Sequence, residues 1–160
     1  MKKYIALYLM LLIILISVPA YSFETETISF SGKNVMAGGQ GIGYFDTSAT
    51  ETLELTTSAV VIRDGEWVAY DLSEYSTGYY TMHITIASSG DVELKALVGD
   101  NIYETEIQST GSDVIFSKKR IFSDLIVTEN GILKLFNESE EALYIAKIWL
   151  EKTVGEEVTI

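Results

Sequence analysis

The sequence predicts an all-β protein that folds as an antiparallel β-sandwich. Short alternating segments separated by turn residues recur between residues 23 and 152, and none of them has a convincing helical period. The single proline, Pro19, precedes this region, so no predicted strand loses a backbone donor. The chain contains no cysteine, so its stability must come from a hydrophobic core, with or without a metal, and not from disulfides.

The first 22 residues have the pattern of a secretory signal peptide. Two lysines precede an apolar run, and Ala20 and Ser22 are the small residues expected before cleavage at Phe23. The run is short for a membrane span, although an uncleaved N-terminal anchor fits the same pattern. We expect a secreted, extracellular or cell-surface protein with a signal peptide at 1–22, one domain at 23–152 and an acidic tail at 153–160.

The charge and the missing residue types exclude several functions. With 11 Lys+Arg against 23 Asp+Glu the net charge is −12, which disfavours nucleic acids and lipid headgroups as partners. One histidine and no cysteine are too few for a catalytic triad or a thiolate or imidazole metal cluster. Paired carboxylates could serve a glycosidase, but among 23 acids such pairs arise by chance. We therefore expect no enzyme.

The segment from Val60 to Leu72 organises the prediction. Asp64-Gly65 separates an apolar run from an alternating run, which is typical of a tight reversal between two strands. In the second strand Val68 and Tyr70 point toward the core, and Trp67 points away from it. Two interpretations of Trp67 fit equally well: contact with a ligand, or partial cover by a neighbouring loop.

The remaining strands are expected between clear turn signals, and residues 109–113 are expected to form an exposed loop. The strands are predicted at residues 23–30, 44–46, 52–55, 79–86, 92–98, 102–107, 114–116, 125–127, 132–136 and 143–150.

Two short polar motifs allow alternative interpretations. Glu24 and Glu26 lie on one face of a predicted strand, roughly 7 Å apart, so either solvent or a cation should separate them. The sequence Asn137-Glu138-Ser139 is either a glycosylation sequon or a polar turn.

Several motifs together resemble family 6 carbohydrate-binding modules. They are Gly38-Gly39, Thr52–Leu55, Ile62-Arg-Asp-Gly-Glu-Trp-Val-Ala-Tyr70, Thr77–Thr81, Ile86–Ser88 and Asn130–Leu135. The resemblance extends from about residue 23 to residue 152. It implies a jelly-roll sandwich of two antiparallel sheets and non-catalytic binding of a polysaccharide or other glycan.

The resemblance also implies where ligands bind. The usual site at one edge needs two aromatic plates and an asparagine, but the matching positions are Val61, Asp113 and Tyr144. That site is therefore expected to be absent or altered, with Tyr44 or Tyr103 as possible substitutes.

A second site, on a sheet face, uses the tryptophan of the motif. Trp67 matches it, and Glu93 and His83 are its expected outward neighbours on adjacent strands. The structural calcium that many members hold would use Glu24 and Glu26. Ala146 stands where an Asp ligand is expected, so this cofactor is in doubt.

Two functions follow from these expectations. The first is a secreted, non-catalytic carbohydrate-binding domain. The alternative is a structural or adhesive surface subunit that keeps the sandwich, has lost sugar binding and self-associates.

Overall fold

The computed structural model describes residues 27–31, 44–49, 51–54, 58–73, 75–129 and 131–153. Every regular element in these ranges is a strand, and none is a helix long and apolar enough to cross a membrane. The strands are β1 (Thr27–Ser31), β2 (Tyr44–Thr47), β3 (Glu51–Glu54), β4 (Ser58–Ile62), β5 (Trp67–Asp71), β6 (Gly78–Ser88), β7 (Val92–Val98), β8 (Asn101–Ile107), β9 (Ser112–Val127), β10 (Ile132–Asn137) and β11 (Leu143–Lys152).

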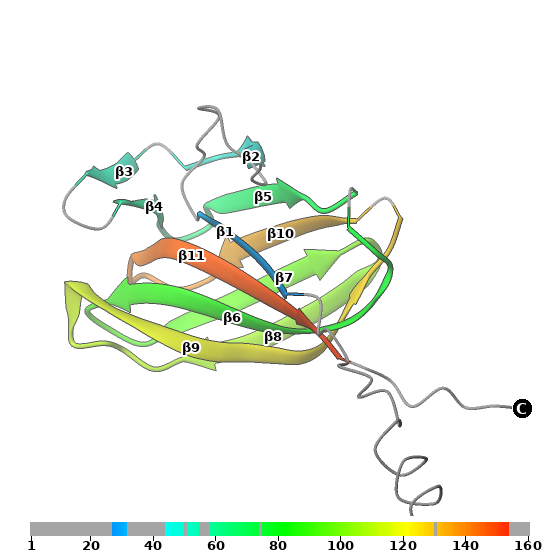
Figure 1. Ribbon diagram of the computed structural model, residues 1–160. Helices are drawn as coiled ribbons and strands as arrows, with labels where there is room; N and C mark the ends of the chain where they lie inside the picture. Colours follow the sequence, from blue (N-terminus) through cyan, green and yellow to red (C-terminus); the bar gives the residue numbers. More distant parts are fainter. Residues whose placement is uncertain are drawn as a thin grey trace, which may run out of the picture.

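The strands form two antiparallel sheets that pack face to face. The six-stranded sheet has the order β3-β4-β11-β6-β9, and β1 also pairs with β11. The five-stranded sheet has the order β2-β5-β10-β7-β8. Figure 1 shows β11, β6 and β9 as one layer, with β10, β7 and β8 as the other. The expected antiparallel sandwich is confirmed.

The core lies between the sheets and is built by alternation along the strands. On β5, Val68 and Tyr70 are fully buried, as the period-two pattern predicts. On β6, alternate residues from Tyr80 to Ile86 are likewise buried against the opposite sheet. On β6 the residues between them, Thr81, His83 and Thr85, face the outer side of the sheet and are half-buried.

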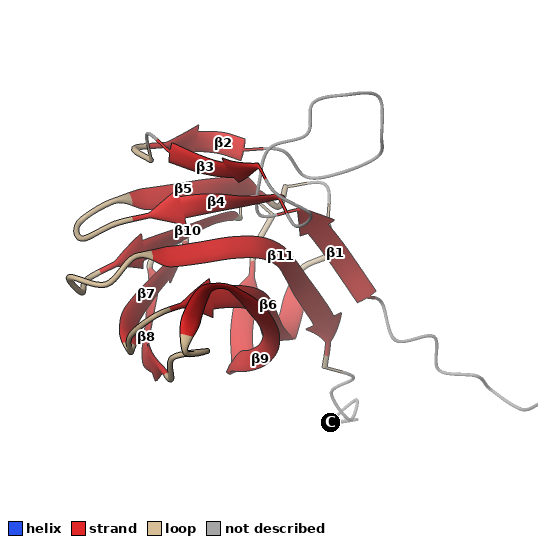
Figure 2. Ribbon diagram, turned by 90° about the vertical axis from the view of Figure 1, so that its left-hand side faces the viewer, coloured by secondary structure: helices blue, strands red, loops and turns tan. Residues whose placement is uncertain are grey.

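Two features of the chain path differ from the prediction. The turn at Asp64-Gly65 does reverse the chain, with Glu66 N donating to Arg63 O at 2.9 Å and Gly65 at a φ of 71°. However, it carries the chain from β4 in one sheet to β5 in the other, so these strands are not paired with each other (Figure 2).

The second difference is β9, which is one strand of 16 residues where the sequence predicts two short strands and a loop reaching residue 113. It is an edge strand whose middle residues are largely exposed, and its pairing with β6 contains register shifts. Exposure and irregular register remove the simple alternation that would have identified it.

A buried asparagine fixes the point where β4, β10 and the start of β11 meet. Asn137 is fully buried, and its Nδ2 donates to Ile62 O at 2.9 Å and to Glu141 O at 2.6 Å. Its Oδ1 accepts from Ser139 N at 2.9 Å and from Ser139 Oγ at 2.7 Å. Both amide hydrogens are thus used inside the fold, so the sequon is a structural turn and Asn137 is no acceptor for a glycan in the folded protein.

Candidate functional site

Trp67 lies on the outer face of the five-stranded sheet and is half-buried. Its ring lies beside Phe136 of β10, with centroids 6.5 Å apart and planes inclined by 44°. The backbone is held in place because Trp67 N donates to Ser48 Oγ at 2.8 Å. Trp67 is therefore partly covered, but it is not buried between the layers.

The strand registers extend this aromatic pair into a row across four strands. Phe136 is the cross-strand partner of Trp67 on one side and of Lys95 on the other, and Lys95 is in turn the partner of Glu104. Neighbouring strands lie about 4.8 Å apart, so the row spans about 14 Å. It presents two rings, then a cation, then a carboxylate.

A lysine covers the aromatic end of this row. Lys134, two residues before Phe136 on β10, places its Nζ 3.6 Å from the centroid of Trp67 and 4.9 Å from that of Phe136. A cation over an aromatic face at an exposed site contributes about 0.5–1 kcal/mol. A ligand that stacks on this face of Trp67 must move the ammonium group aside.

The charged end of the row holds a concentration of carboxylates. Lys95 Nζ lies 3.2 Å from Glu138 Oε1 and 3.6 Å from Glu104 Oε1. The hydrogen bond and charge of Glu138, with a smaller contribution from Glu104, raise the pKa of Lys95 above its usual value. Glu93 is exposed beside them and lines a shallow hollow of about 340 Å³ together with Glu104, Glu106 and Glu138. Among the described residues, no group of three acidic or histidine side chains has the geometry of a metal site.

The structure separates His83 from Trp67. His83 lies on β6 in the six-stranded sheet, and Trp67 lies on β5 in the other sheet, so the expected adjacency is wrong. Both residues face outward, but from opposite sides of the sandwich. His83 Nε2 instead lies 3.6 Å from Glu151 Oε2 on β11. Alternation fixes which way a side chain points, but not which sheet its strand joins.

The other expected ligand residues are only partly described. Tyr44 lies on the edge strand β2, and its cross-strand partner is Tyr70 on β5, the strand that also carries Trp67. Glu24 and Glu26 lie outside the described residues, so the predicted calcium ligands stay a prediction. Ala146 lies at the register shift in β11, where the strand's neighbour changes from β4 to β1.

The edge site that the resemblance implied is filled by packed side chains. Val61 and Tyr144 are cross-strand partners; Val61 is fully buried, and only 9% of Tyr144 is exposed. Asp113 accepts a hydrogen bond from Ser89 N at 3.1 Å. Tyr103 lies on β8 of the other sheet, where it packs on Phe122 of β9 with a centroid distance of 5.6 Å. Neither tyrosine therefore presents an open aromatic plate at the expected edge site.

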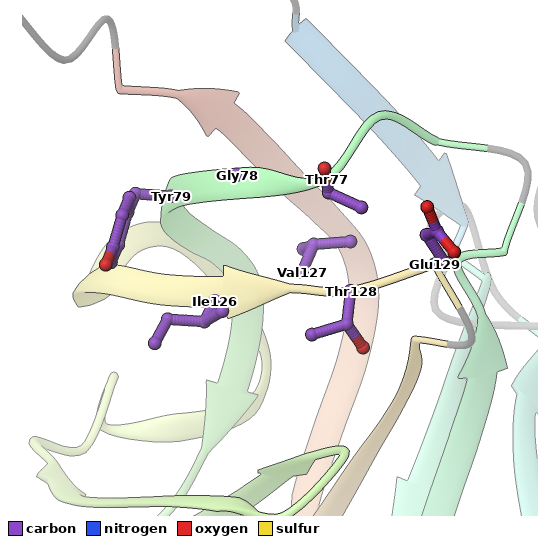
Figure 3. A pocket seen from close by; sticks show the side chains of 7 residues that line it. All are labelled: Thr77, Gly78, Tyr79, Ile126, Val127, Thr128 and Glu129. Carbon is purple, nitrogen blue, oxygen red and sulfur yellow. The ribbon is translucent and has the colours of Figure 1, made fainter.

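The sequence analysis did not predict an open hollow that lies where β6 begins and β9 ends. It has a volume of about 450 Å³ and is lined by Tyr79, Ile126, the two threonines 77 and 128, and Glu129 (Figure 3). Tyr79 is 56% exposed, and its register partner on β9 is Ile126. The outward position of Tyr79 is visible from alternation, but the hollow requires β6 and β9 to be paired.

Comparisons with known proteins identify the fold. No protein-family model matches the chain, and no curated protein matches it in sequence. Among solved structures, CsCBM6-3 from Clostridium stercorarium in complex with cellobiose matches with a TM-score of 0.55 and 14% identity, over 69% of this chain and 88% of that one. The carbohydrate-binding module CBM36 in complex with calcium and xylotriose matches with a TM-score of 0.53 and 14% identity, over 76% and 98%.

A larger enzyme that contains such a module also matches. The Podospora anserina GH26-CBM35 β-(1,4)-mannanase has a TM-score of 0.55 and 12% identity, and the match covers 82% of this chain but only 29% of the mannanase. At these identities the likeness concerns the fold alone. The chain therefore has the two-sheet fold of carbohydrate-binding modules, as its sequence motifs predicted.

Proposed function

We propose that this protein is a secreted, non-catalytic domain that binds a polysaccharide through the Trp67–Phe136 row. The observation that carries the proposal is the pair of outward-facing rings on neighbouring strands, continued by Lys95 and Glu104. A sugar ring has an apolar C–H face and a polar rim of hydroxyl groups. An aromatic pair beside hydrogen-bonding side chains matches both parts.

The shape of the surface favours a chain ligand over a small molecule. The row is an open strip about 14 Å long across a sheet face, and not an enclosed pocket. An extended oligosaccharide can lie along such a strip, with one unit on the rings and others near Lys95 and Glu104. The fold shared with modules whose structures contain cellobiose or xylotriose supports this ligand class.

The proposal is tested with a panel of neutral polysaccharides, including cellulose, xylan, mannan and laminarin. We expect Trp67→Ala to lower the affinity for the bound polysaccharide at least tenfold, which corresponds to about 1.4 kcal/mol. Tyr79→Ala, which removes an exposed ring on the other sheet, should change it less than twofold. Affinity electrophoresis measures both, and circular dichroism verifies that each variant is folded. Failure of the wild-type protein to bind any of these polysaccharides contradicts the proposal. A larger loss of affinity in Tyr79→Ala than in Trp67→Ala would place the binding site at the Tyr79 hollow instead.

Removing the lysine that covers Trp67 should strengthen binding of the same neutral ligand. Because the ligand no longer has to displace the ammonium group, we expect Lys134→Ala to raise affinity about two- to fivefold. Isothermal titration calorimetry with a soluble oligosaccharide gives the value. Lys147→Ala, which removes a lysine from the opposite face, is the matched control. A large loss of affinity in Lys134→Ala would show that the ammonium group contacts the sugar and does not block it.

A structural or adhesive role is the second candidate. It is favoured by the packed side chains at the usual edge site and by Val114 and Ile115, consecutive residues near the start of β9 that are 57% and 58% exposed. Concentration-dependent assembly in light scattering, lost in a Val114→Ser/Ile115→Ser double variant, would support this role over sugar binding.

A further inference from the structure

We propose that the outer face of the six-stranded sheet carries a second binding site, for a carboxylate of an acidic polysaccharide such as a polyuronate. The site is centred on Trp149 of β11, on the opposite side of the sandwich from Trp67. Naming a glycan as the ligand rests on the proposed function; the presence of an anion site does not.

Two lysines are held over the same indole ring. Lys147 Nζ lies 3.8 Å and Lys118 Nζ lies 4.3 Å from the ring centroid of Trp149, so the two ammonium groups are at most about 8 Å apart. They come from β11 and β9, on either side of Thr85 of β6, which is the register partner of both. Trp149 Nε1 donates to Thr85 Oγ1 at 3.4 Å, which anchors the edge of the ring on β6.

The positive charge at this position is only partly compensated. Glu151 Oε1 lies 4.0 Å from Lys118 Nζ, and its other oxygen faces His83. Within the part of the chain that the structure describes, Lys147 makes no ion pair. Arg120, the register partner of His83, adds a third cation and donates to Ser123 Oγ. In a chain with a net charge of −12, this local excess of cations stands out from the rest of the surface.

Two like charges held close together are best stabilised by an anion between them. The indole holds both ammonium groups in place, so little side-chain freedom is lost when a carboxylate bridges them. Because the lysines occupy the space over the ring, a neutral sugar cannot stack there without displacing them. The site therefore differs from the Trp67 row in its ligand as well as in its position.

A uronate polymer fits this surface better than a densely charged polyanion. It carries one carboxylate per sugar, and the remainder of each unit is neutral. The acidic protein around the site repels a polymer with a high charge density. The expected binding is weak to moderate and falls as salt rises, because Lys118 is exposed and Lys147 is only half-buried.

The experiment measures affinity for polygalacturonate, for dextran sulfate as the denser polyanion and for neutral dextran. We expect Lys118→Gln and Lys147→Gln each to weaken polygalacturonate binding at least fivefold. Arg63→Gln, which removes the same charge from an exposed position in the β4–β5 turn, should change it less than twofold. Neutral dextran is the uncharged control, and neither Lys118→Gln nor Lys147→Gln should change its binding. The three substitutions are at the protein surface, and thermal unfolding verifies that each variant remains folded.

Each other outcome overturns the proposal in a distinct way. Equal losses in Lys118→Gln, Lys147→Gln and Arg63→Gln, or equal binding of dextran sulfate, would mean unspecific attraction of polyanions. Assembly of the protein that is lost in Lys147→Gln, without binding of polygalacturonate, would make the carboxylates of a second copy the ligand. No effect of Lys118→Gln or Lys147→Gln would remove the site. Trp67→Ala separates the two proposals, because it should weaken binding of neutral polysaccharide at least tenfold and leave polygalacturonate binding within twofold.

Discussion

Replacing Leu135 with alanine is expected to lower the free energy of unfolding by about 2–5 kcal/mol. Leu135 is fully buried on the inner face of β10, where Val68 of β5 and Ala96 of β7 are its register partners. The substitution removes buried methyl groups from the centre of the five-stranded sheet and leaves a cavity that its neighbours fill only in part. Urea denaturation followed by tryptophan fluorescence gives the difference.

Leu97→Ala is the matched control for this prediction. Leu97 lies on the outer face of β7 and is half-buried, so the same chemical change should cost about 1 kcal/mol or less. The pair tests which face of this sheet meets the core, and so whether the Trp67 row faces solvent. A cost for Leu97→Ala as large as that for Leu135→Ala would mean that the outer face is covered and would contradict the proposed site.

Replacing Asn137 with alanine is expected to lower the free energy of unfolding by about 2–4 kcal/mol. Its side chain satisfies the backbone carbonyls of Ile62 and Glu141 and the backbone N–H of Ser139. Alanine would remove partners from polar groups at a fully buried position and would loosen the junction of β4, β10 and β11. Such groups cost about 1–3 kcal/mol each when they are buried without a partner.

Asn101→Ala provides the comparison for Asn137→Ala. Asn101 is the first residue of β8, where its Nδ2 makes a long contact of 3.4 Å with Val98 O, so its loss should cost less than about 0.5 kcal/mol. Mass spectrometry of protein secreted from a glycosylating host should show Asn137 unmodified. Full glycosylation there, or a cost below 1 kcal/mol for Asn137→Ala, would show that the buried amide is not needed.

Much of the fold could be predicted because the alternation of apolar and polar residues along a strand shows which of its side chains face the core. Alternation along β5 and β6 places Val68 and Tyr70 inside and Trp67 and His83 outside, as the structure shows. The same rule points Phe136 outward after Leu133 and Leu135, although no local pattern connects Phe136 with Trp67. The irregular strand β9 is where this rule fails, since an edge strand exposes residues on both faces.

The sequence by itself determined the all-β class, the inward and outward sides of most strands and the outward position of Trp67, because these follow from the two-residue period of an extended chain. Only the tertiary structure decided which strands are neighbours. It separated His83 from Trp67, placed Phe136 and Lys134 beside that ring, and brought Lys118 and Lys147 together over Trp149. The physical reason is that pairing between strands far apart in sequence depends on how both sheets bury their inner faces together, which no local pattern contains.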